Sequence, residues 1–388
     1  MKYDDRYIVE LSRAAIFDDT PFNPKEELNW NYIYSKSIDQ NITGLLFTAI
    51  NKLSDEYRPN TDLYAKWQKK MFETIAVTSR QYNEFSRMTK TISETGIKIV
   101  VLKGGFMRRI YPTPELRTMG DFDVLVKKSD LKKIANLFKS NGYEVNKAVF
   151  GVEVKNEKAF WEIFYVLEEE FVIAPEENTL MIYDNSVSVD SFFIPKETLF
   201  LSHMIVHTGK HYVEKGAGVR NLLDIALYIS RYKQELDFDK ISRLCAKQNY
   251  RKIHNYILSA VKQWYGVDLS DVQFDECDST LFIEYTLLNG IFGKHGNVLL
   301  PQIAKPTDDS ISGFRKLFFP TAKALENRYK YLRKSPFLLP IAWVHRFLSG
   351  IFFRKFSLKT MIKDLKEARC FSDERLKWLN DLNLKEEH

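Results

Sequence analysis

A β-branched run that stops at a glycine pair constrains the fold of this chain more than any other sequence feature. Residues 97–102 read IKIVVL, which is typical of a strand buried on both faces, and Lys103, Gly104 and Gly105 follow directly. Glycine lets the backbone turn tightly and come close to a neighbouring group. The pattern therefore predicts a buried strand whose glycine turn lies at an edge of a sheet.

A second predicted strand carries two acidic residues. After a short helix over residues 106–110 and a proline-containing break at 111–114, residues 121–126 read DFDVLV and alternate as a strand does. Successive side chains of a strand point to opposite faces. Asp121 and Asp123 are therefore predicted to share one face.

Helical periodicity lies on both sides of these strands. Residues 62–94 contain no Gly or Pro and predict one long helix, and residues 1–60 also look helical. Further predicted elements are a helix over 131–140, strands at 143–145, 159–167 and 187–193, and helices near 197–210, 219–233, 238–247 and 251–264. We therefore predict an α+β fold in three parts, a helical region over 1–94, a catalytic core over 95–195 and a helical domain over 196–388.

Composition limits the class of protein. Hydrophobic residues make up 45% of the 388 residues, which is enough for a proper core. The first residues lack the pattern of a secretion signal, so we expect a cytoplasmic protein. Cys245, Cys277 and Cys370 form no CxxC pair and are expected to be reduced and structural.

Positive charge is concentrated towards the C-terminal end. Residues 311–370 hold fourteen Lys or Arg against three Asp or Glu, with aromatic residues interleaved. This composition fits binding to RNA or to an anionic membrane surface, and it also fits a basic exposed face over an aromatic core. Polar residues interrupt the apolar stretch 337–353, so no membrane span is predicted there.

The two acidic residues suit metal-assisted transfer of a phosphate-containing group. Such reactions use divalent cations with oxygen ligands, and two carboxylates on one strand face make part of a Mg²⁺ or Mn²⁺ site. A third carboxylate from a neighbouring strand is expected to complete it. Lys103 and Arg117 add positive charge, and a side chain at Gly105 is expected to fill the space that phosphates need.

Taken together, these features resemble a known family. VLKGGFMRRIYPTPELRTMGDFDVLV is similar to the core of the uncharacterised bacterial nucleotidyltransferases of the DNA polymerase β-like superfamily. HMIVHTGKHYVEKGAGVRNLLDIALYI resembles the family's His, Lys-His, Gly, Arg and Asp helix pair, and a looser likeness extends the match to residues 95–350. Abortive-infection nucleotidyltransferase toxins share the KGG, Arg and Asp-x-Asp outline.

The resemblance implies a polymerase β-like nucleotidyltransferase core with a mixed sheet, flanked by helical N-terminal and C-terminal regions. It implies an enzyme that uses Mg²⁺ or Mn²⁺ to move a nucleoside monophosphate from a nucleoside triphosphate to an acceptor hydroxyl. The acceptor is left open among a small molecule, a glycan precursor, a protein and a tRNA. A tRNA-modifying toxin and a catalytically silent nucleotide-binding module remain alternatives.

The resemblance also implies the site residues. It assigns metal binding and catalysis to Asp121, Asp123 and a third carboxylate, for which Glu162 is preferred and Asp190 is the rival. The family has a Glu-Leu-His-like strand at this position, and Phe164 replaces the histidine here. Nucleotide binding is assigned to Lys103, Gly104, Gly105, Arg117, His207, Lys210 and His211.

Two further groups leave alternatives open. Three histidines at helical spacing, which suit a transition metal on one helix face, are His203, His207 and His211. Against a metal, Gly209 is expected to weaken that helix, and no fourth ligand is evident. Arg220 and Asp224 are expected to form a structural ion pair or to line the same groove.

Overall fold

The structure, a computed structural model, describes residues 1–167, 171, 173–214, 217–289 and 335–343. Met1–His211 and Ala217–Ile291 make up one compact unit, and the remaining residues make up a second. Within the second unit, a 3-10 helix covers Pro336–Leu338. The predicted basic segment 311–370 lies outside the described residues except for 335–343.

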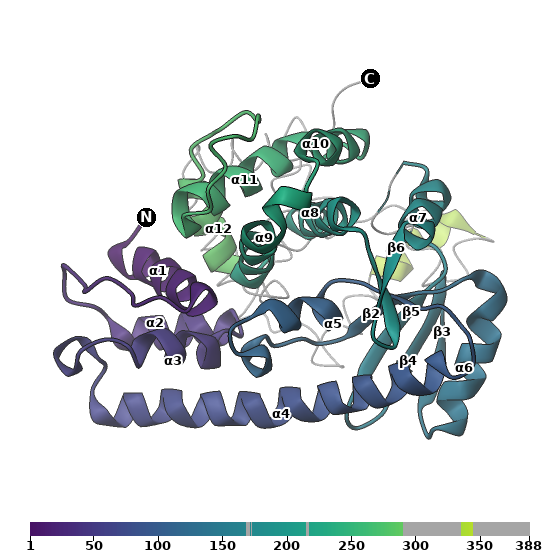
Figure 1. Ribbon diagram of the computed structural model, residues 1–388, viewed down its shortest axis with the longest axis horizontal. Coiled ribbons are helices and arrows are strands. Elements are labelled where there is room, and N and C mark those ends of the chain that lie inside the picture. Colours follow the sequence, from purple (N-terminus) through teal and green to yellow (C-terminus); the bar gives the residue numbers. More distant parts are fainter. Residues whose placement is uncertain (168–170, 172, 215–216, 290–334, 344–388) are drawn as a thin grey trace. The chain divides into compact units, whose positions relative to one another are not determined.

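A seven-stranded mixed sheet forms the centre of the first unit (Figure 1). The strands are β1 (Val100–Val101), β2 (Phe122–Leu125), β3 (Glu144–Ala148), β4 (Gly151–Lys155), β5 (Phe160–Phe164), β6 (Ser186–Val189) and β7 (Phe192–Pro195). They lie in the order β3-β4-β5-β2-β1-β7-β6, with β1 antiparallel to β2 and parallel to β7, and with β2 parallel to β5. The predicted α+β class and mixed sheet are confirmed.

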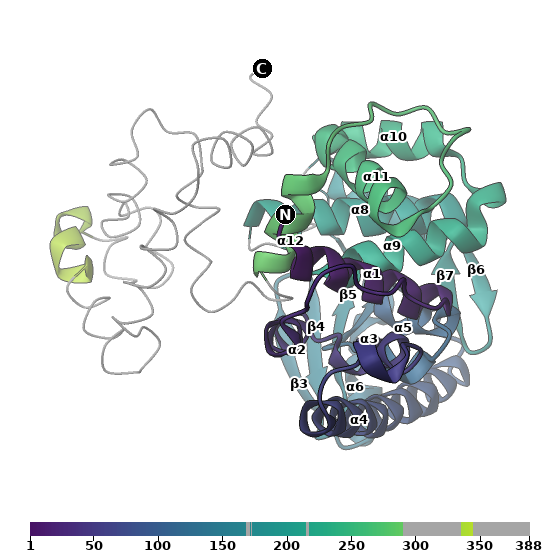
Figure 2. The same cartoon turned by 90° about the vertical axis from the view of Figure 1, so that its left-hand side faces the viewer.

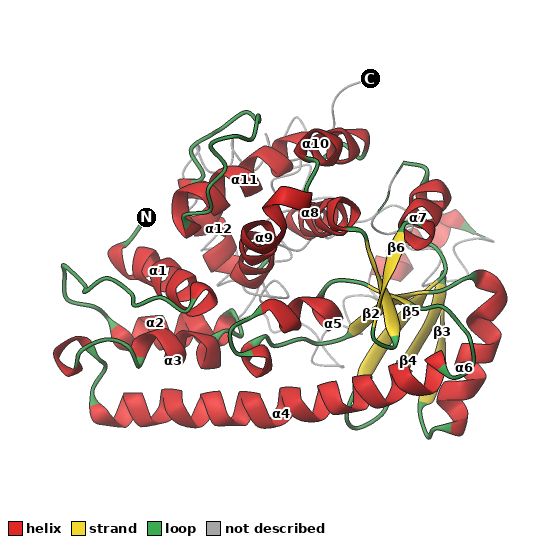
Figure 3. Ribbon diagram, viewed as in Figure 1, coloured by secondary structure: helices red, strands yellow, loops and turns green. Residues whose placement is uncertain are grey.

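Helices precede, interrupt and follow the sheet (Figure 3). They are α1 (Tyr3–Phe17), α2 (Trp30–Asp39), α3 (Thr43–Ile50), α4 (Thr61–Ser93), α5 (Gly104–Met107), α6 (Leu131–Ser140), α7 (Pro175–Asp184), α8 (Glu197–Glu214), α9 (Val219–Tyr232), α10 (Phe238–Lys247), α11 (Arg251–Tyr265) and α12 (Thr280–Asn289). Helix α4 lies along one side of the sheet, and α8 and α9 lie on the other side in both views (Figures 1 and 2). Within the described residues, no helix is long and apolar enough to cross a bilayer.

An aromatic stack joins α4 to the sheet. The Phe85 ring of α4 stacks on Phe122 of β2, with centroids 4.6 Å apart, and on Trp161 of β5 at 5.3 Å. Phe138 of α6 meets the same indole edge-on at 5.3 Å. These side chains define the core face of the sheet, and burying such rings is the main favourable contribution to packing here.

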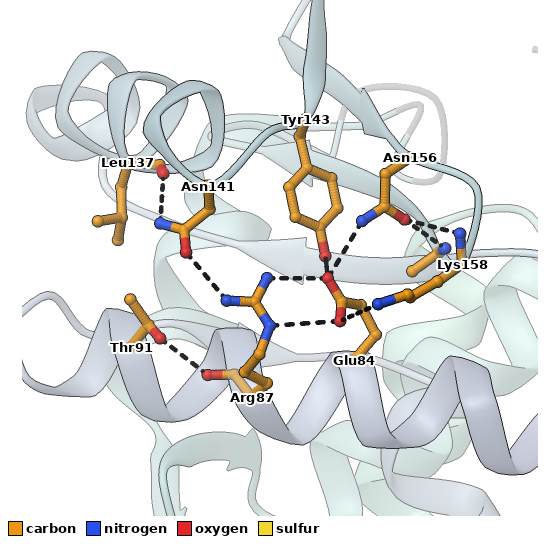
Figure 4. A network of polar contacts seen from close by, with 9 residues as sticks. Glu84, Arg87, Thr91, Leu137, Asn141, Tyr143, Asn156 and Lys158 are labelled. Carbon is orange, nitrogen blue, oxygen red and sulfur yellow. Dashed lines mark hydrogen bonds and ion pairs between the residues drawn. The ribbon is translucent and has the colours of Figure 1, made fainter.

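A polar network closes the edge of this core (Figure 4). Glu84 of α4 is only 6% exposed, and it accepts hydrogen bonds from Arg87 Nη2 at 2.8 Å, the Tyr143 hydroxyl at 2.6 Å and Asn156 Nδ2 at 3.1 Å. Arg87 also donates to Asn141 Oδ1 at 2.9 Å. Chiefly because of Arg87, the pKa of Glu84 falls to about 2, so this carboxylate is charged and satisfied inside the fold.

Most predicted helices are confirmed, whereas several strands differ from the prediction in their bounds or were not predicted. Residues 97–102 were predicted as one strand, whereas β1 covers only Val100–Val101, with one further backbone hydrogen bond on each side, from Phe193 N to Ile99 O and from Leu102 N to Asp123 O. The predicted strand 187–193 is a hairpin of β6 and β7, because the chain reverses at Asp190, which has φ 51°. Neither β4 nor α7 was predicted.

The helices on both sides of the sheet belong to the same compact unit as the strands. Helix α1 packs against α3, α9 and α11. Gln40, directly after α2, donates to the carbonyls of Thr286 and Leu287 in α12, at 2.9 and 3.1 Å, and accepts from Val219 N at 2.9 Å. The proposed three-part division of the chain remains a prediction.

Candidate active site

A strained turn carries Lys103 from β1 to α5. Leu102 N still donates to Asp123 O across the sheet at 2.9 Å, and Lys103 then adopts φ 48° and ψ −118°. A non-glycine residue in this region stores on the order of 1–3 kcal/mol of strain, and such strain gathers at functional sites. The turn places Lys103 Nζ 2.9 Å from Asp123 Oδ1.

Gly104 and Gly105 are needed for close packing. A Cβ at Gly104 would collide with the Arg117 guanidinium, and a Cβ at Gly105 would lie 2.7 Å from Val101 Cγ1 and 3.3 Å from the Phe85 ring. A side chain at Gly105 was expected to fill the space that phosphates need, but a Cβ there would point at Val101 and Phe85 in the hydrophobic core, so its first effect would be on packing. Binding of nucleotide at Gly104 and Gly105 remains a prediction.

Three carboxylates lie close together on the face of the sheet opposite the core face, which we call the site face. Asp123 of β2 and Glu162 of β5 are register partners on adjacent parallel strands, and Asp121 precedes Asp123 by two residues. We call Asp121, Asp123 and Glu162 the carboxylate row. Phe122 and Trp161, which alternate with the row, point to the core face.

The row concentrates negative charge. The pKa of Glu162 is raised to about 7, chiefly by burial and then by the nearby charges of Asp123 and Asp121, while Lys103 opposes the shift. Glu153 of β4, the register partner of Glu162 on its other side, adds a smaller effect in the same direction. Glu153 was not among the predicted site residues, because β4 was not predicted from the sequence.

Asp190, the rival third carboxylate, lies elsewhere. It sits at the turn between β6 and β7, its side chain is 67% exposed, and it forms an ion pair with Arg109. The structure therefore brings Glu162, and not Asp190, next to the Asp-x-Asp pair.

Helix α8 adds histidines to the Lys103 turn. The ring nitrogens of His207 lie 3.3 and 3.4 Å from Lys103 Nζ, and His211 Nε2 lies 2.9 Å from His207 Nε2. Two ring nitrogens at that distance share one proton between donor and acceptor. Lys103 thus contacts both Asp123 of the carboxylate row and His207, and nucleotide binding by Lys103, His207 and His211 remains a prediction.

The remainder of that helix face is packed. His203 is 1% exposed and stacks on His207 with ring centroids 6.2 Å apart, and Lys210 is also buried. Gly209 was expected to weaken the helix, yet α8 continues through it. A Cβ at Gly209 would lie 2.9 Å from Tyr250 Cδ1, so the absence of a side chain lets the Tyr250 ring pack against the helix.

Arg117 lies behind the glycine turn. Its Nη2 is 2.5 Å from Asp224 Oδ2, the side chain is 6% exposed, and the Tyr111 hydroxyl donates to Asp224 Oδ1 at 2.7 Å. Of the two alternatives for Arg220 and Asp224, the ion pair is not formed, because Arg220 donates to the Thr118 carbonyl at 2.8 Å and Asp224 binds Arg117; the alternative that both line the groove remains a prediction. Contact between Arg117 and a nucleotide remains a prediction.

Oxygen donors suited to Mg²⁺ are present in the row, whereas a finished metal site is not. Among the residues that the structure describes, no three His, Cys, Asp or Glu side chains are arranged to hold a metal ion, which applies to the carboxylate row and to the α8 histidines alike. Lys103 supplies positive charge at Asp123 in this arrangement. The donor chemistry of the three carboxylates fits a hard divalent cation.

Residues 26–266 match the sequence family described as uncharacterised nucleotidyltransferase, which is more than half of the chain. The chain belongs to this nucleotidyltransferase family. The matched range contains the whole sheet, the carboxylate row and α8 to α10. The acidic residues of this nucleotidyltransferase therefore lie within the region that it shares with its family. No curated protein and no solved structure matched the chain.

Proposed function

We propose that this nucleotidyltransferase transfers a nucleoside monophosphate from a Mg²⁺-bound nucleoside triphosphate to an acceptor hydroxyl at the carboxylate row. The observation that carries the proposal is the register of Asp123 and Glu162 on parallel strands, with Asp121 beside them and Lys103 2.9 Å from Asp123. The superfamily assignment to polymerase β-like enzymes belongs to the same proposal.

Asp121, Asp123 and Glu162 would hold the Mg²⁺ or Mn²⁺. When bound, such an ion neutralises charge on the triphosphate and lowers the pKa of an attacking hydroxyl. The role of the chain is to gather the oxygen ligands on one rigid strand pair, so that little reorganisation remains for the moment of reaction.

Glu162 is suited to accept the proton of the acceptor hydroxyl. Its carboxylate lies on β5 in register with Asp123 of β2, which places it next to the proposed metal ligands and within the site where the acceptor hydroxyl would enter. The acceptor oxygen then bonds to the α-phosphorus, the bond from that phosphorus to the bridging oxygen breaks, and diphosphate leaves.

Lys103, His207 and His211 form the positively charged and hydrogen-bonding side of the site. The Lys103 ammonium lies between Asp123 and His207, so a phosphate entering next to the row meets it directly. Hydrogen bonding to His211 orients the His207 ring towards that ammonium. Lys210 and Arg117, which are more deeply buried, complete the proposed nucleotide-binding set.

The acceptor stays open among a small molecule, a glycan precursor, a protein and a tRNA. The basic segment 311–370, on which RNA or membrane binding was predicted, lies almost wholly outside the described residues. A catalytically silent module is the weaker alternative, because a protein without catalysis has no need to gather three carboxylates and a strained lysine turn.

Transfer itself is the test. The protein is incubated with each α-labelled nucleoside triphosphate, Mg²⁺ and a cell extract divided into small-molecule, protein and RNA fractions. We expect label to move into one fraction, and the Asp121→Ala/Asp123→Ala variant to transfer none. Transfer that survives in this variant would show that the row is not the active site.

A further inference from the structure

Lys103 combines a fixed backbone with a movable side chain. Leu102 N donates to Asp123 O at 2.9 Å, and Lys103 O accepts from the N–H groups of Phe106 and Met107 at 3.2 and 3.0 Å. These bonds hold the strained turn, in which Lys103 has φ 48°. The side chain is a flexible four-carbon stem that carries a compact charge at its end. The ammonium can therefore change its position while the turn stays as it is.

The ammonium contacts the site from two elements. Lys103 Nζ is 2.9 Å from Asp123 Oδ1 of β2, and the ring nitrogens of His207 of α8 lie 3.3 and 3.4 Å from it. The Lys103 and Asp123 side chains are only 14% and 8% exposed, so solvent ions screen their attraction weakly. One oxygen of the Asp123 carboxylate is thus already bound to a cation that the chain itself provides.

A divalent cation at the carboxylate row would have to share Asp123 with this ammonium. Two cations held at one carboxylate repel each other strongly in a partly buried setting. Asp121 and Glu162, the other members of the row, are partly exposed, so a cation can reach the row from solvent. Lys103 therefore competes with a divalent cation for Asp123.

A triphosphate changes the outcome of this competition. Its oxygens offer the ammonium a multiply charged partner, and hydrogen bonds between two charged groups are the strong ones. His207 already contacts the ammonium and can keep it in the site after it leaves Asp123. Binding of the divalent cation and binding of the triphosphate should therefore favour each other, each to the same extent.

We propose that Lys103 holds the place of the divalent cation at Asp123 and moves to the triphosphate when that cation binds. The protein then takes up the cation tightly only together with a nucleotide. The inference rests on the proposed function, because it takes Asp123 as a metal ligand and the carboxylate row as the place where the triphosphate binds.

Titration with Mn²⁺ alone, followed by the electron paramagnetic resonance signal of the free ion, tests the competition. Lys103→Met keeps the length of the side chain and removes its charge, so it should bind Mn²⁺ about 5- to 100-fold more tightly than the wild type. Lys103→Arg keeps the charge and should bind Mn²⁺ no more tightly than the wild type. Lys127→Met, which removes the same charge from an exposed position after β2, should stay within about 3-fold of the wild type.

Calorimetric titration with inorganic tripolyphosphate and Mg²⁺ tests the movement to the triphosphate. Lys103→Met should bind this probe about 10- to 100-fold more weakly than the wild type, because a charged hydrogen-bonding group is lost. A variant that only misfolds would lose affinity for both probes, whereas the inference requires opposite changes. If Lys103→Met is unstable, the rise in its melting temperature on adding Mn²⁺ is measured instead and should exceed that of the wild type.

Either of two results overturns the inference. The first is a Lys103→Met protein whose Mn²⁺ affinity, or whose rise in melting temperature with Mn²⁺, is no greater than that of the wild type. The second is wild-type affinity of Lys103→Met for tripolyphosphate. Both leave the proposed function standing, which would instead be contradicted by a wild-type protein that binds no nucleoside triphosphate with Mg²⁺.

Discussion

Two carboxylates, Glu84 of α4 on the core side of the sheet and Glu162 of β5 on the site face, have opposite surroundings. Glu84, at the edge of the core face, accepts hydrogen bonds from Arg87, Tyr143 and Asn156, and its pKa falls to about 2. Glu162, on the site face, lies beside Asp123 and has a pKa raised to about 7.

The groups that surround a buried carboxylate distinguish a structural acid from a functional one. The chain surrounds Glu84 with donors, so its charge stabilises the native state without help from outside. At Glu162 the chain gathers like charges and leaves them incompletely balanced, which is unfavourable for the fold alone and becomes useful when a cation binds.

The largest expected effect comes from neutralising Glu162. Glu162→Gln should lower turnover by about 10²- to 10⁴-fold, because it removes the proposed proton acceptor and a metal ligand. It should also raise the melting temperature of the metal-free protein, since repulsion within the row is relieved. Asp190→Asn, at the exposed β6–β7 turn, is the matched control and should change neither quantity appreciably. The reverse pattern would transfer the role of third carboxylate to Asp190.

Neutralising Glu84 should have the opposite consequence. Glu84→Gln should lower the free energy of unfolding by about 2–3 kcal/mol, measured by urea denaturation, because charge-assisted hydrogen bonds are lost in a buried setting. Turnover per folded molecule should stay at the wild-type value. Lys158→Ala is the control, since Lys158 Nζ is 4.0 Å from Glu84 and 62% exposed and should contribute little. If Glu84→Gln had the same free energy of unfolding as the wild type, the claim that Glu84 is a structural acid would be contradicted.

A substitution in the turn that contains Gly104 and Gly105 should have a smaller effect on stability and activity. Gly105→Ala should cost about 1–3 kcal/mol of stability, because the new methyl group overpacks against Val101 and Phe85 in the core. The variant should also transfer nucleotide more slowly, since Lys103 two residues earlier depends on the same turn. Wild-type stability in this variant would show that the core has room there.

The pH dependence should separate the acids with opposite slopes. The folded pKa of Glu84 is below its unfolded value of 4.5, so its stabilisation is present above pH 4.5 and is lost as pH falls towards about 2. The folded pKa of Glu162 is raised, so metal-free wild-type protein should lose stability relative to Glu162→Gln as pH rises from 4.5 to about 7. Each slope is at most about 1.4 kcal/mol per pH unit. If the stability of the wild type and of Glu162→Gln changed with pH in the same way, the raised pKa of Glu162 would be contradicted.

Much of the helical architecture could be predicted from sequence because helices are local. The expected helix over 62–94 is α4, and the expected helix over 131–140 coincides with α6. The strands were harder, because pairing is not local. Gly151 in β4 gave no strand signal, yet a Cβ there would collide with the Ile163 carbonyl of the neighbouring strand.

The candidate site shows the same limit. The Asp-x-Asp pair and the Lys-Gly-Gly turn were evident from spacing alone, and Lys103 does lie against Asp123. The choice between Glu162 and Asp190 needed the register of β2 with β5, and the partner of Asp224 needed a contact between residues 107 positions apart. Neither the strand register nor this long-range contact can be predicted from the periodicity of the sequence.

The most direct test of the central claim is calorimetric titration of ATP, CTP, GTP and UTP into the wild-type protein, with Mg²⁺ and separately with EDTA. If the site-face carboxylates lack their cation, a triphosphate cannot approach them unscreened, so binding should be seen with Mg²⁺ and be lost in EDTA. The Asp121→Ala/Asp123→Ala protein should lose the Mg²⁺-dependent binding. Equal affinity with Mg²⁺ and with EDTA would contradict the account, because the carboxylate row would then have no cation to hold.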